Sequence, residues 1–369
     1  MDNFMKCLLH QNIEVKHICI STNKHTFSNN AYPSQLKIEV DNHYINTDIT
    51  PIKALKELFS KGSYNINRFY CDGLANKISK ELVQENYDCI ILESLFTTKY
   101  IETMRSISDV PIFLRTHNIE HKITSDLAKN ASGLKKIYLN KLAKDLKSYE
   151  IETLKTVDGI LSISKDDTAQ IKELAISTSI KTISVSVNCP KVVNKYNSEG
   201  IFHLGSMNWE PNLEAVDRLI KLFPQIKNAI PSCKLHIAGS ASDAHNLMQQ
   251  EKGIYYDGFV NDINEYASDK GILVSPIISG SGIRIKILEM MAIGIPVITT
   301  ELGASGINYV NGKELIIANS DEELTKASID LIKNKKKRQE LGENGIHYIR
   351  KNHNIESISK EILEFIERT

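Results

Sequence analysis

Short apolar runs alternate with longer amphipathic stretches along most of the chain. Runs typical of buried strands occur at residues 15–20, 89–92, 111–114, 159–164, 183–187, 201–204, 234–238, 254–260, 272–274 and 296–300. Between many of them, apolar residues recur every three or four positions, which is the pattern of a helix with one buried face. This alternation predicts an α/β fold in which helices cover both faces of parallel sheets.

Helices are predicted at residues 51–61, 72–85, 98–106, 133–155, 321–333, 337–350 and 355–368. Residues 23–50 are polar and predict an irregular segment. The chain opens on a helix that leads into the run at residues 15–20, whereas a doubly wound domain usually opens on a strand and a glycine-rich turn. The pattern therefore predicts that the first strand of the N-terminal domain is missing.

The length of 369 residues suits two domains. A polar segment at residues 188–200, which contains Pro190, predicts the linker between them. The predicted domains are residues 1–190 and 198–350, and residues 351–369 are predicted to form a C-terminal helix.

Composition narrows the class of protein. The 45 basic and 45 acidic residues cancel, so nothing in the charge predicts a nucleic-acid partner. The six cysteines form no CxxC pair and have no metal-ligand spacing, which indicates reduced thiols in a cytosolic protein. Residues 1–11 are too polar for a secretory signal, and no segment reaches the roughly 18 apolar residues of a membrane span. We therefore expect a cytoplasmic protein whose contact with a membrane, if any, is peripheral.

The second half contains a glycine-bearing loop that connects a strand to a helix. Gly280, Ser281 and Gly282 follow the run at residues 272–274, and the helix after them ends at Gly294. A loop that requires glycine can bring its backbone close to a ligand. The first turn of the following helix has N–H groups without intrahelical partners, and its dipole favours anions. Such loops are also common in α/β proteins without a bound anion.

Charged residues at the start of this helix sharpen the prediction. Arg284 and Lys286 place two cations at the same helix end, which suits a diphosphate. Glu289 lies one turn further on and is positioned to accept hydrogen bonds from the hydroxyl groups of a ribose. Together these residues predict a site for a nucleotide-diphosphate sugar, without a metal-ligand motif.

Another glycine turn follows the strand at the beginning of the second domain. Gly205 and Ser206 precede Asn208, the predicted helix cap, and Pro211, which suits the first turn of a helix. A strand, a glycine turn and a helix start provide a second place for a phosphate. Trp209, the only tryptophan, indicates packing more than ligand stacking.

In the first domain, residues 115–121 read RTHNIEH directly after a strand. Ligands of parallel sheets lie beyond the carboxyl ends of the strands. His117 can therefore donate a hydrogen bond or a proton to a ligand near neutral pH, although a cap or a bond to a carbonyl is an equally simple role. His121 is expected to be structural, and Ser164, after the strand at residues 159–164, is expected to cap a helix.

The predicted helix at residues 133–155 is amphipathic and basic. A charged face of this kind is usually solvated. The alternative is peripheral contact with an anionic membrane or with a lipid diphosphate.

Three of these motifs resemble glycosyltransferase family 4, also called group 1, which includes bacterial enzymes of polysaccharide biosynthesis. They are Gly-x-Gly-x-Arg-x-Lys-x-Leu-Glu at residues 280–289, Gly-Ser-Met-x-Trp-x-Pro-Asn at 205–212 and His-Asn-x-Glu-His at 117–121. The resemblance implies the GT-B fold, in which two Rossmann-like domains face a central cleft. The N-terminal domain would then lie on the acceptor side, the C-terminal domain would bind the nucleotide sugar, and the last helix would pack back toward the N-terminal domain.

The resemblance also assigns roles to single residues. Arg284 and Lys286 would hold the donor diphosphate, Glu289 the ribose, and His117 would lie in the active site. The remaining predicted donor-binding residues are Gly205, Ser206, Asn208, Gly280, Ser281, Gly282, Gly303 and, through their backbones at the nucleobase, Phe259 and Val260. Many family members have a glutamate that contacts the donor sugar at the position of Ser281, so the identity of the sugar stays open.

The activity implied is a retaining, metal-independent transfer from a UDP- or GDP-sugar to a glycan or lipid-linked acceptor. No cofactor is expected beyond this nucleotide-sugar co-substrate, and the catalytic residues would be His117, Arg284 and Lys286. Two alternatives stay open: a sugar-nucleotide epimerase of the same fold, and a nucleotide-sugar-binding subunit without catalysis.

Overall fold

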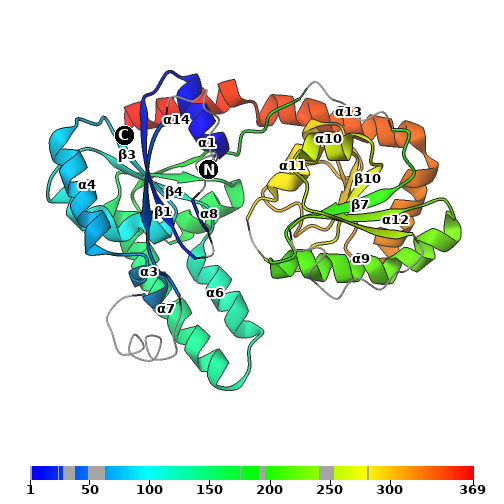
Figure 1. Cartoon of the computed structure of the whole chain (residues 1–369), viewed down its shortest axis with the longest axis horizontal. Coiled ribbons are helices and arrows are strands. Elements are labelled where there is room, and N and C mark those ends of the chain that lie inside the picture. Colours follow the sequence, from blue (N-terminus) through cyan, green and yellow to red (C-terminus); the bar gives the residue numbers. More distant parts are fainter. Residues whose placement is uncertain are drawn as a thin grey trace. The chain divides into compact units, whose positions relative to one another are not determined.

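The computed structural model describes residues 2–23, 25–27, 38–48, 63–174, 176–190, 196–240, 253–280 and 282–369 (Figure 1). The predicted helix at residues 51–61 and the predicted donor contact Ser281 lie outside the described residues. The chain forms two compact units, Met1–Ser184 with Glu356–Thr369, and Val185–Ile355. Among the described helices, none combines the length and the apolar character needed to cross a membrane.

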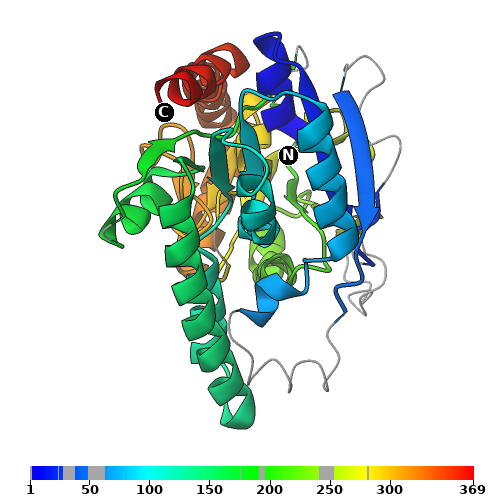
Figure 2. The same cartoon turned by 90° about the vertical axis from the view of Figure 1, so that its left-hand side faces the viewer.

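The first unit contains parallel strands surrounded by helices (Figures 1 and 2). Its elements are α1 (Asp2–His10), β1 (Val15–Ser21), β2 (Ile38–Tyr44), α3 (Tyr64–Asn67), α4 (Asp72–Gln84), β3 (Ile90–Glu93), the 3₁₀ helix η1 (Leu95–Tyr100), α5 (Ile101–Arg105), β4 (Ile112–Thr116), α6 (Glu120–Lys129), α7 (Gly133–Thr156), β5 (Gly159–Ser162), α8 (Lys165–Glu173), β6 (Ser179–Thr182) and α14 (Ile355–Arg368).

The hydrogen-bonded sheets of this unit are β3-β4-β5-β6 and, separately, β1-β2. Strands β4 and β5 are buried along their whole length, as expected for strands covered on both faces. The final helix belongs to this unit, and its Phe365 ring lies 6.0 Å from the ring of Phe113 in β4.

Two predictions for this unit are wrong. Part of the segment predicted to be irregular forms β2, whose polar sequence suits a strand with half-exposed side chains. The strand predicted at residues 183–187 lies earlier in the sequence than predicted. It is β6 (Ser179–Thr182), which pairs with β5. The alternation that suggested a strand is real, because Ile183, Val185 and Val187 are buried. Only Ile183 continues the pairing of β6, since its N–H donates to the carbonyl of Ser162 in β5, and the described residues 184–187 belong to no strand.

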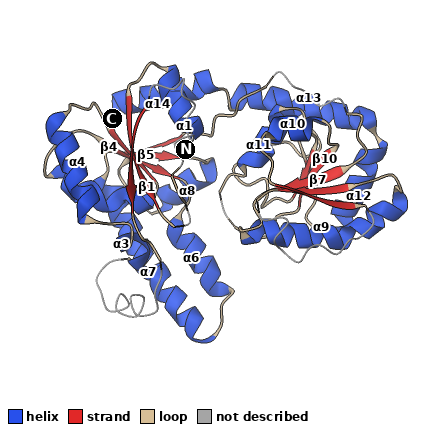
Figure 3. Cartoon of the chain, in the orientation of Figure 1, coloured by secondary structure: helices blue, strands red, loops and turns tan. Residues whose placement is uncertain are grey.

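The second unit has one six-stranded parallel sheet (Figure 3). Its elements are β7 (Ile201–Leu204), α9 (Glu210–Ala229), β8 (Leu235–Ala238), β9 (Ile254–Gly258), α10 (Ile263–Ser268), β10 (Ile272–Ser275), α11 (Ile285–Ala292), β11 (Val297–Thr299), β12 (Ile316–Ile317), α12 (Asp321–Lys333) and α13 (Lys335–Asn352). The spatial order is β12-β11-β10-β7-β8-β9, so the chain changes direction across the sheet between β7 and β10. In open parallel sheets, ligands bind beyond the carboxyl ends of strands at such a switch point.

Candidate functional site

Most of the predicted site residues lie at one edge of the second unit's sheet, beyond the carboxyl ends of its parallel strands. They are Gly205, Ser206 and Asn208 after β7, Phe259 and Val260 after β9, Gly280 and Gly282 after β10, Arg284 and Lys286 at the start of α11 with Glu289 one turn further along it, and Gly303 after β11. The sheet therefore gathers segments that are about a hundred residues apart in the sequence.

Lys286 is fixed by three acceptors. Its Nζ donates to the carbonyl oxygen of Leu204 at 2.8 Å and to Asn212 Oδ1 at 2.8 Å, and it lies 3.2 Å from His203 Nε2. His203 Nδ1 lies 3.0 Å from the carbonyl oxygen of Val274, so Nδ1 carries the proton and Nε2 can accept from the lysine. These contacts hold the amine between the end of β7 and the first turn of α9.

The ionisation of this site responds to burial. Burial, and then the charge of Arg284, lower the pKa of Lys286 to about 7. Burial alone lowers the pKa of Arg284 to about 10, and it raises the pKa of Glu289. Among the described residues no carboxylate contacts the Lys286 amine, so its acceptors are all neutral. An anion bound here would favour the charged form of the lysine.

Arg284 forms the N-cap of α11 and lies against the glycine-bearing loop. Its Nη1 donates to the carbonyl oxygen of Gly282 at 2.8 Å and its Nη2 to that of Ser279 at 3.3 Å. The guanidinium lies 5.1 Å from the ring centre of Trp209, so the tryptophan packs on this arginine. Gly280 and Gly282 have φ angles of +87° and +82°, a conformation that strains other residues.

The turn after β7 is held by hydrogen bonds. Ser240, at the end of β8, donates from Oγ to Ser206 Oγ at 2.7 Å. The prediction that Asn208 caps the following helix is wrong, because the N-cap of α9 is Trp209. The Asn208 N–H donates to Ser206 Oγ at 3.3 Å. Pro211 lies in the first turn of α9, as predicted. The helix begins at Glu210, which is later than a cap at Asn208 would place it.

Two further predicted segments complete this edge. The N–H of Gly303 donates to Thr300 Oγ1 at 2.9 Å. A Cβ at Gly303 would lie 2.1 Å from Thr299 Oγ1, so the contact between this backbone and the threonine side chain requires glycine. Phe259 and Val260 follow β9, and the Phe259 side chain is 72% exposed.

His117 lies in the first unit, in the loop after β4, and contacts a largely buried carboxylate. Its Nε2 is 2.6 Å from Oε2 of Glu93, the last residue of β3, and Arg115 Nη1 is 3.0 Å from the same oxygen. Burial opposes ionisation of Glu93, but the hydrogen bond from His117 and the charge of Arg115 together lower its pKa. Because the ionised carboxylate accepts, His117 Nε2 carries a proton and Nδ1 is the nitrogen left to exchange one.

The other two polar residues considered in this unit have structural contacts. His121 is buried, and its Nδ1 lies 2.6 Å from Glu150 Oε2. Ser164 is the N-cap of α8 and accepts from the Asp167 N–H at 3.0 Å.

Three residues that contact the predicted groups were not predicted from the sequence: Asn212, His203 and Glu93. Each carries a recognisable signal. Asn212 is a polar residue in the first turn after a glycine loop, His203 interrupts an otherwise apolar strand, and Glu93 closes an apolar strand with an acid. Among the described residues, no three His, Cys, Asp or Glu side chains are grouped in a way that could hold a metal ion.

Comparison with known proteins identifies the fold. Residues 198–334 match the family model described as glycosyl transferases group 1. Among solved structures, sucrose-phosphate synthase from Thermosynechococcus elongatus has a TM-score of 0.71 at 12% identity, covering 98% of this chain and 90% of that one. Anabaena HepE, solved with UDP and glucose, has a TM-score of 0.70 at 13% identity, covering 99% and 95%. The fold is GT-B.

Two further relatives match a smaller part of the chain. A mutant of S. aureus TarM, solved with Fondaparinux, alpha-GlcNAc-glycerol and UDP, has a TM-score of 0.62 at 18% identity over 79% of this chain. This chain spans only 58% of the TarM chain. By sequence, the chain is 23% identical over 296 residues to an uncharacterized 44.6 kDa protein in the cps region of Klebsiella pneumoniae, covering 76% of this chain and 75% of that protein.

Proposed function

We propose that this protein is a retaining glycosyltransferase of family 4 that transfers a sugar from a UDP- or GDP-sugar to a glycan or lipid-linked acceptor in cell-surface polysaccharide biosynthesis. The observation that carries the proposal is the buried Lys286 amine, which is held by neutral acceptors beside Arg284 in a stretch that matches the group 1 family model. The cps region of the K. pneumoniae relative supports the polysaccharide role.

The chemistry of the donor explains why these groups are needed. Transfer breaks the bond between the anomeric carbon and the diphosphate, and negative charge develops on the departing diphosphate. Arg284, Lys286 and the start of α11 supply positive charge there, which supports a metal-independent reaction. Each charge-assisted contact contributes about 1.5–3 kcal/mol. We assign His117 to the sugar side of the reaction, Glu289 to the ribose, and the backbones of Phe259 and Val260 to the base.

The direct test is incubation of the protein with UDP- and GDP-sugars and lipid-linked or oligosaccharide acceptors, followed by NMR of the product. The proposal predicts release of nucleoside diphosphate and a new glycosidic bond with the anomeric configuration of the donor. An epimerised nucleotide sugar would contradict it in favour of an epimerase. Tight nucleotide binding with no turnover of any donor would indicate the binding subunit.

Glu93→Gln tests how His117 is held. An amide cannot accept from His117 Nε2 as strongly as the carboxylate does, and an amide that rotates can present its NH₂ to the ring. We expect kcat to fall about 10- to 100-fold, with KM for the donor nearly unchanged, because positioned proton transfer typically contributes 10²–10⁴-fold. The control is Glu81→Gln in α4. Unchanged kcat in Glu93→Gln would contradict the role of His117.

Nucleotide binding should take up a proton above pH 7. The pKa of Lys286 is lowered to about 7, so at pH 8 the amine is mainly neutral, and a bound diphosphate raises this pKa by stabilising the ammonium. The affinity for nucleotide therefore falls as pH rises through about 7 to 9. Calorimetry at pH 8 in two buffers of different ionisation enthalpy measures the uptake, which we expect to approach one proton and to vanish in Lys286→Met. Uptake near zero in the wild-type protein would contradict the account.

We also propose a cytoplasmic protein with peripheral contact to anionic membrane. In Figures 1 and 2, α6 and α7 form a hairpin that extends beyond the strands of the first unit. At the start of α7, Leu134 and Ile137 are 85% and 67% exposed on either side of Lys135 and Lys136. Apolar and basic side chains together suit an anionic bilayer surface.

This contact is tested by sedimentation with vesicles that contain phosphatidylglycerol. The double variant Leu134→Ser with Ile137→Ser should lose at least fivefold in bound fraction, because its apolar side chains are removed while the lysines remain. Val83→Ser in α4 is the matched control, since Val83 is 73% exposed. Equal binding by both variants would contradict the assignment.

A further inference from the structure

The first unit contains an arginine, Arg68, that has no carboxylate partner among the described residues. It is the C-cap of α3, and its side chain is half-buried. The other arginines of this unit each form an ion pair: Arg105 with Asp158, Arg115 with Glu93, and Arg368 with Glu364. Charged groups that are withdrawn from water are normally paired, so Arg68 indicates a place where an anion from outside the chain can bind.

The guanidinium of Arg68 has N–H groups that its described contacts do not use. Its Nε donates to the carbonyl oxygen of Asn65 at 3.4 Å, and its Nη1 donates to that of Thr47 at 3.5 Å. Both contacts are longer than usual and both acceptors are neutral. A guanidinium carries five N–H donors in a planar fork, which matches the oxygens of a phosphate.

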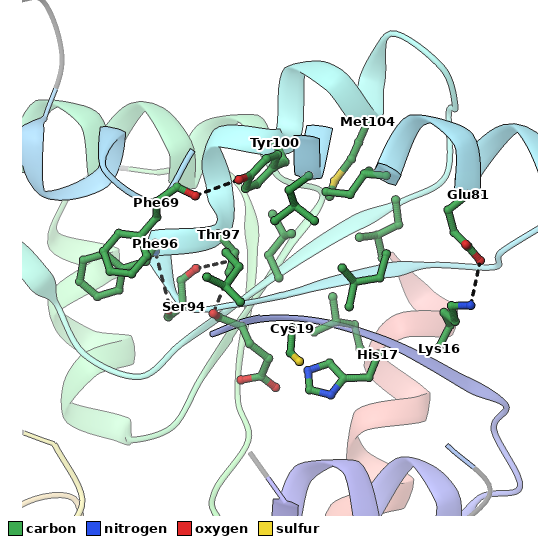
Figure 4. Close-up of a pocket in the computed structure, with 18 of the residues that line it drawn as sticks. Lys16, His17, Cys19, Phe69, Glu81, Ser94, Phe96, Thr97, Tyr100 and Met104 are labelled. Carbon is green, nitrogen blue, oxygen red and sulfur yellow. Dashed lines mark hydrogen bonds and ion pairs between the residues drawn. The ribbon is translucent and has the colours of Figure 1, made fainter. Parts of the chain in front are cut away.

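Aromatic side chains fix the position of this guanidinium. It lies 5.1 Å from the ring centre of Phe69. Figure 4 shows the Phe69 ring beside that of Phe96, and the two ring centres are 5.0 Å apart. The Phe69 carbonyl accepts from the hydroxyl of Tyr100, a buried residue, at 2.8 Å. The Phe69 ring therefore covers one face of the guanidinium and leaves the N–H groups at its edge to form hydrogen bonds.

The electrostatic surroundings of Arg68 favour an anion. Burial lowers the pKa of Arg68, and among the described residues the groups that oppose this effect are the phenols of Tyr64 and Tyr138. Phenols are ordinarily neutral near pH 7. Tyr64 is buried in α3, Tyr138 is half-buried in α7, and these two helices pack together. Each phenol can donate its O–H, so the three side chains form a set of donors beside which the structure describes no competing carboxylate.

Tyr138 connects this set of donors to the membrane contact proposed for α7. It follows Leu134 by four residues and therefore lies one helical turn, about 5.4 Å, further along the same side of the helix. Leu134 and Ile137 are the exposed apolar residues of that contact. When their side chains enter a bilayer, Tyr138 and Arg68 lie at the depth of the lipid headgroups. A lipid phosphate is the anion found at that depth.

We propose that Arg68, together with the hydroxyl groups of Tyr64 and Tyr138, binds the phosphate monoester or diphosphate of a membrane lipid. Arg68 pairs with two phosphate oxygens, and the phenols donate to the others. The proposal rests on the membrane contact of the proposed function, and it names a phosphate-bearing lipid as a ligand of the first unit. It does not involve the donor site of the second unit.

The test is binding to phosphatidylcholine vesicles that contain phosphatidic acid, a phosphate monoester, or phosphatidylglycerol, a diester, at matched surface charge. A monoester offers one more unesterified oxygen to the guanidinium and the phenols. The wild-type protein should bind the phosphatidic acid vesicles at least fivefold more tightly. Arg68→Gln should lose this preference and stay within twofold of wild type on phosphatidylglycerol. Equal binding of the wild-type protein to both vesicles, or an unchanged preference in Arg68→Gln, overturns the proposal.

Lys136→Gln is the matched control, because it also removes one positive charge, from the exposed start of α7. It should weaken binding to both kinds of vesicle by the same factor, as expected for general attraction to anionic lipid. The same behaviour in Arg68→Gln would mean that Arg68 contributes only general charge, which overturns the proposal.

Tyr138→Phe is the second variant, because it removes one hydroxyl group and keeps the ring. It should lower the preference for phosphatidic acid about two- to fivefold. This variant decides the outcome if Arg68→Gln lowers the thermal midpoint, and an unchanged preference in Tyr138→Phe would then overturn the proposal.

Glycerol 3-phosphate separates a lipid phosphate from a soluble one. At the concentration of the exposed phosphatidic acid it should not release the wild-type protein from the vesicles, because it brings no apolar anchor. Release would assign the site to a soluble phosphate ester and overturn the assignment to a lipid. Stabilisation by nucleotides should be equal in Arg68→Gln and the wild-type protein, so failure of this site is distinguishable from failure of the donor site.

Discussion

Lys286→Met should lower kcat/KM for the donor by about 100- to 1,000-fold, which is the typical loss when one preorganised group that stabilises developing charge is removed. Methionine keeps the unbranched shape of the side chain, so the variant removes the charge without leaving a large cavity. It also leaves Asn212 Oδ1 and His203 Nε2 without the amine they now contact. Donor turnover and nucleotide affinity are measured on the same preparation.

The control for this variant is Lys326→Met on the exposed face of α12, which should behave as wild type. Lys286→Arg is informative as well, because a guanidinium cannot enter the space of an amine held at 2.8 Å by two oxygens. Near-normal turnover in Lys286→Met would refute the assignment of this residue to the diphosphate.

Gly239→Ala should destabilise the second unit by more than about 4 kcal/mol, a loss confined to a short list of structural causes. A Cβ at this position would lie 1.8 Å from the carbonyl oxygen of Gly205, and the φ angle of +141° is unfavourable for alanine. The clashing atoms belong to the backbone at the ends of β7 and β8, where the Gly205 N–H donates to the Ala238 carbonyl at 2.9 Å. They cannot rotate away as a side chain would.

Urea unfolding of Gly239→Ala is compared with that of Gly312→Ala. Gly312 also has a positive φ, +78°, but no atom lies within 4 Å of the position of its Cβ. The control therefore carries the conformational cost of about 1–2 kcal/mol without a clash. Equal stability of the two variants would contradict this prediction, because it would show that the backbones at Gly205 and Gly239 can move apart to make room for the methyl group.

The sequence predicted the loop and helix that contain Arg284 and Lys286 because their signals are local. Glycines mark the loop, apolar residues mark the buried face of α11, and Gly294 marks its end. The contacts of Lys286 are not local, since His203 and Asn212 precede it by 83 and 74 residues. They come together only because β7 and β10 are neighbours in the sheet.

Edge strands account for the errors in secondary structure. Central strands such as β4 are buried and read as apolar runs, whereas β2 and β6 have half-exposed side chains and a weak pattern. Val185 and Val187 have the apolar pattern of a strand, but their backbones contact His353, which does not belong to a strand. The Val187 N–H donates to the carbonyl of His353 after α13, a contact between segments 166 residues apart that no local pattern encodes.

Thermal unfolding against UDP, GDP, ADP and their sugar conjugates, with chelator present, tests the central claim most directly. A ligand at about 100 times its dissociation constant adds roughly 2.7 kcal/mol to stability. The account predicts that one nucleotide series, of uridine or guanosine, raises the midpoint by several degrees in the wild-type protein and in Lys326→Met, and that Lys286→Met abolishes the shift. No shift with any nucleotide, or an equal shift in Lys286→Met, would contradict a donor site at residues 280–289.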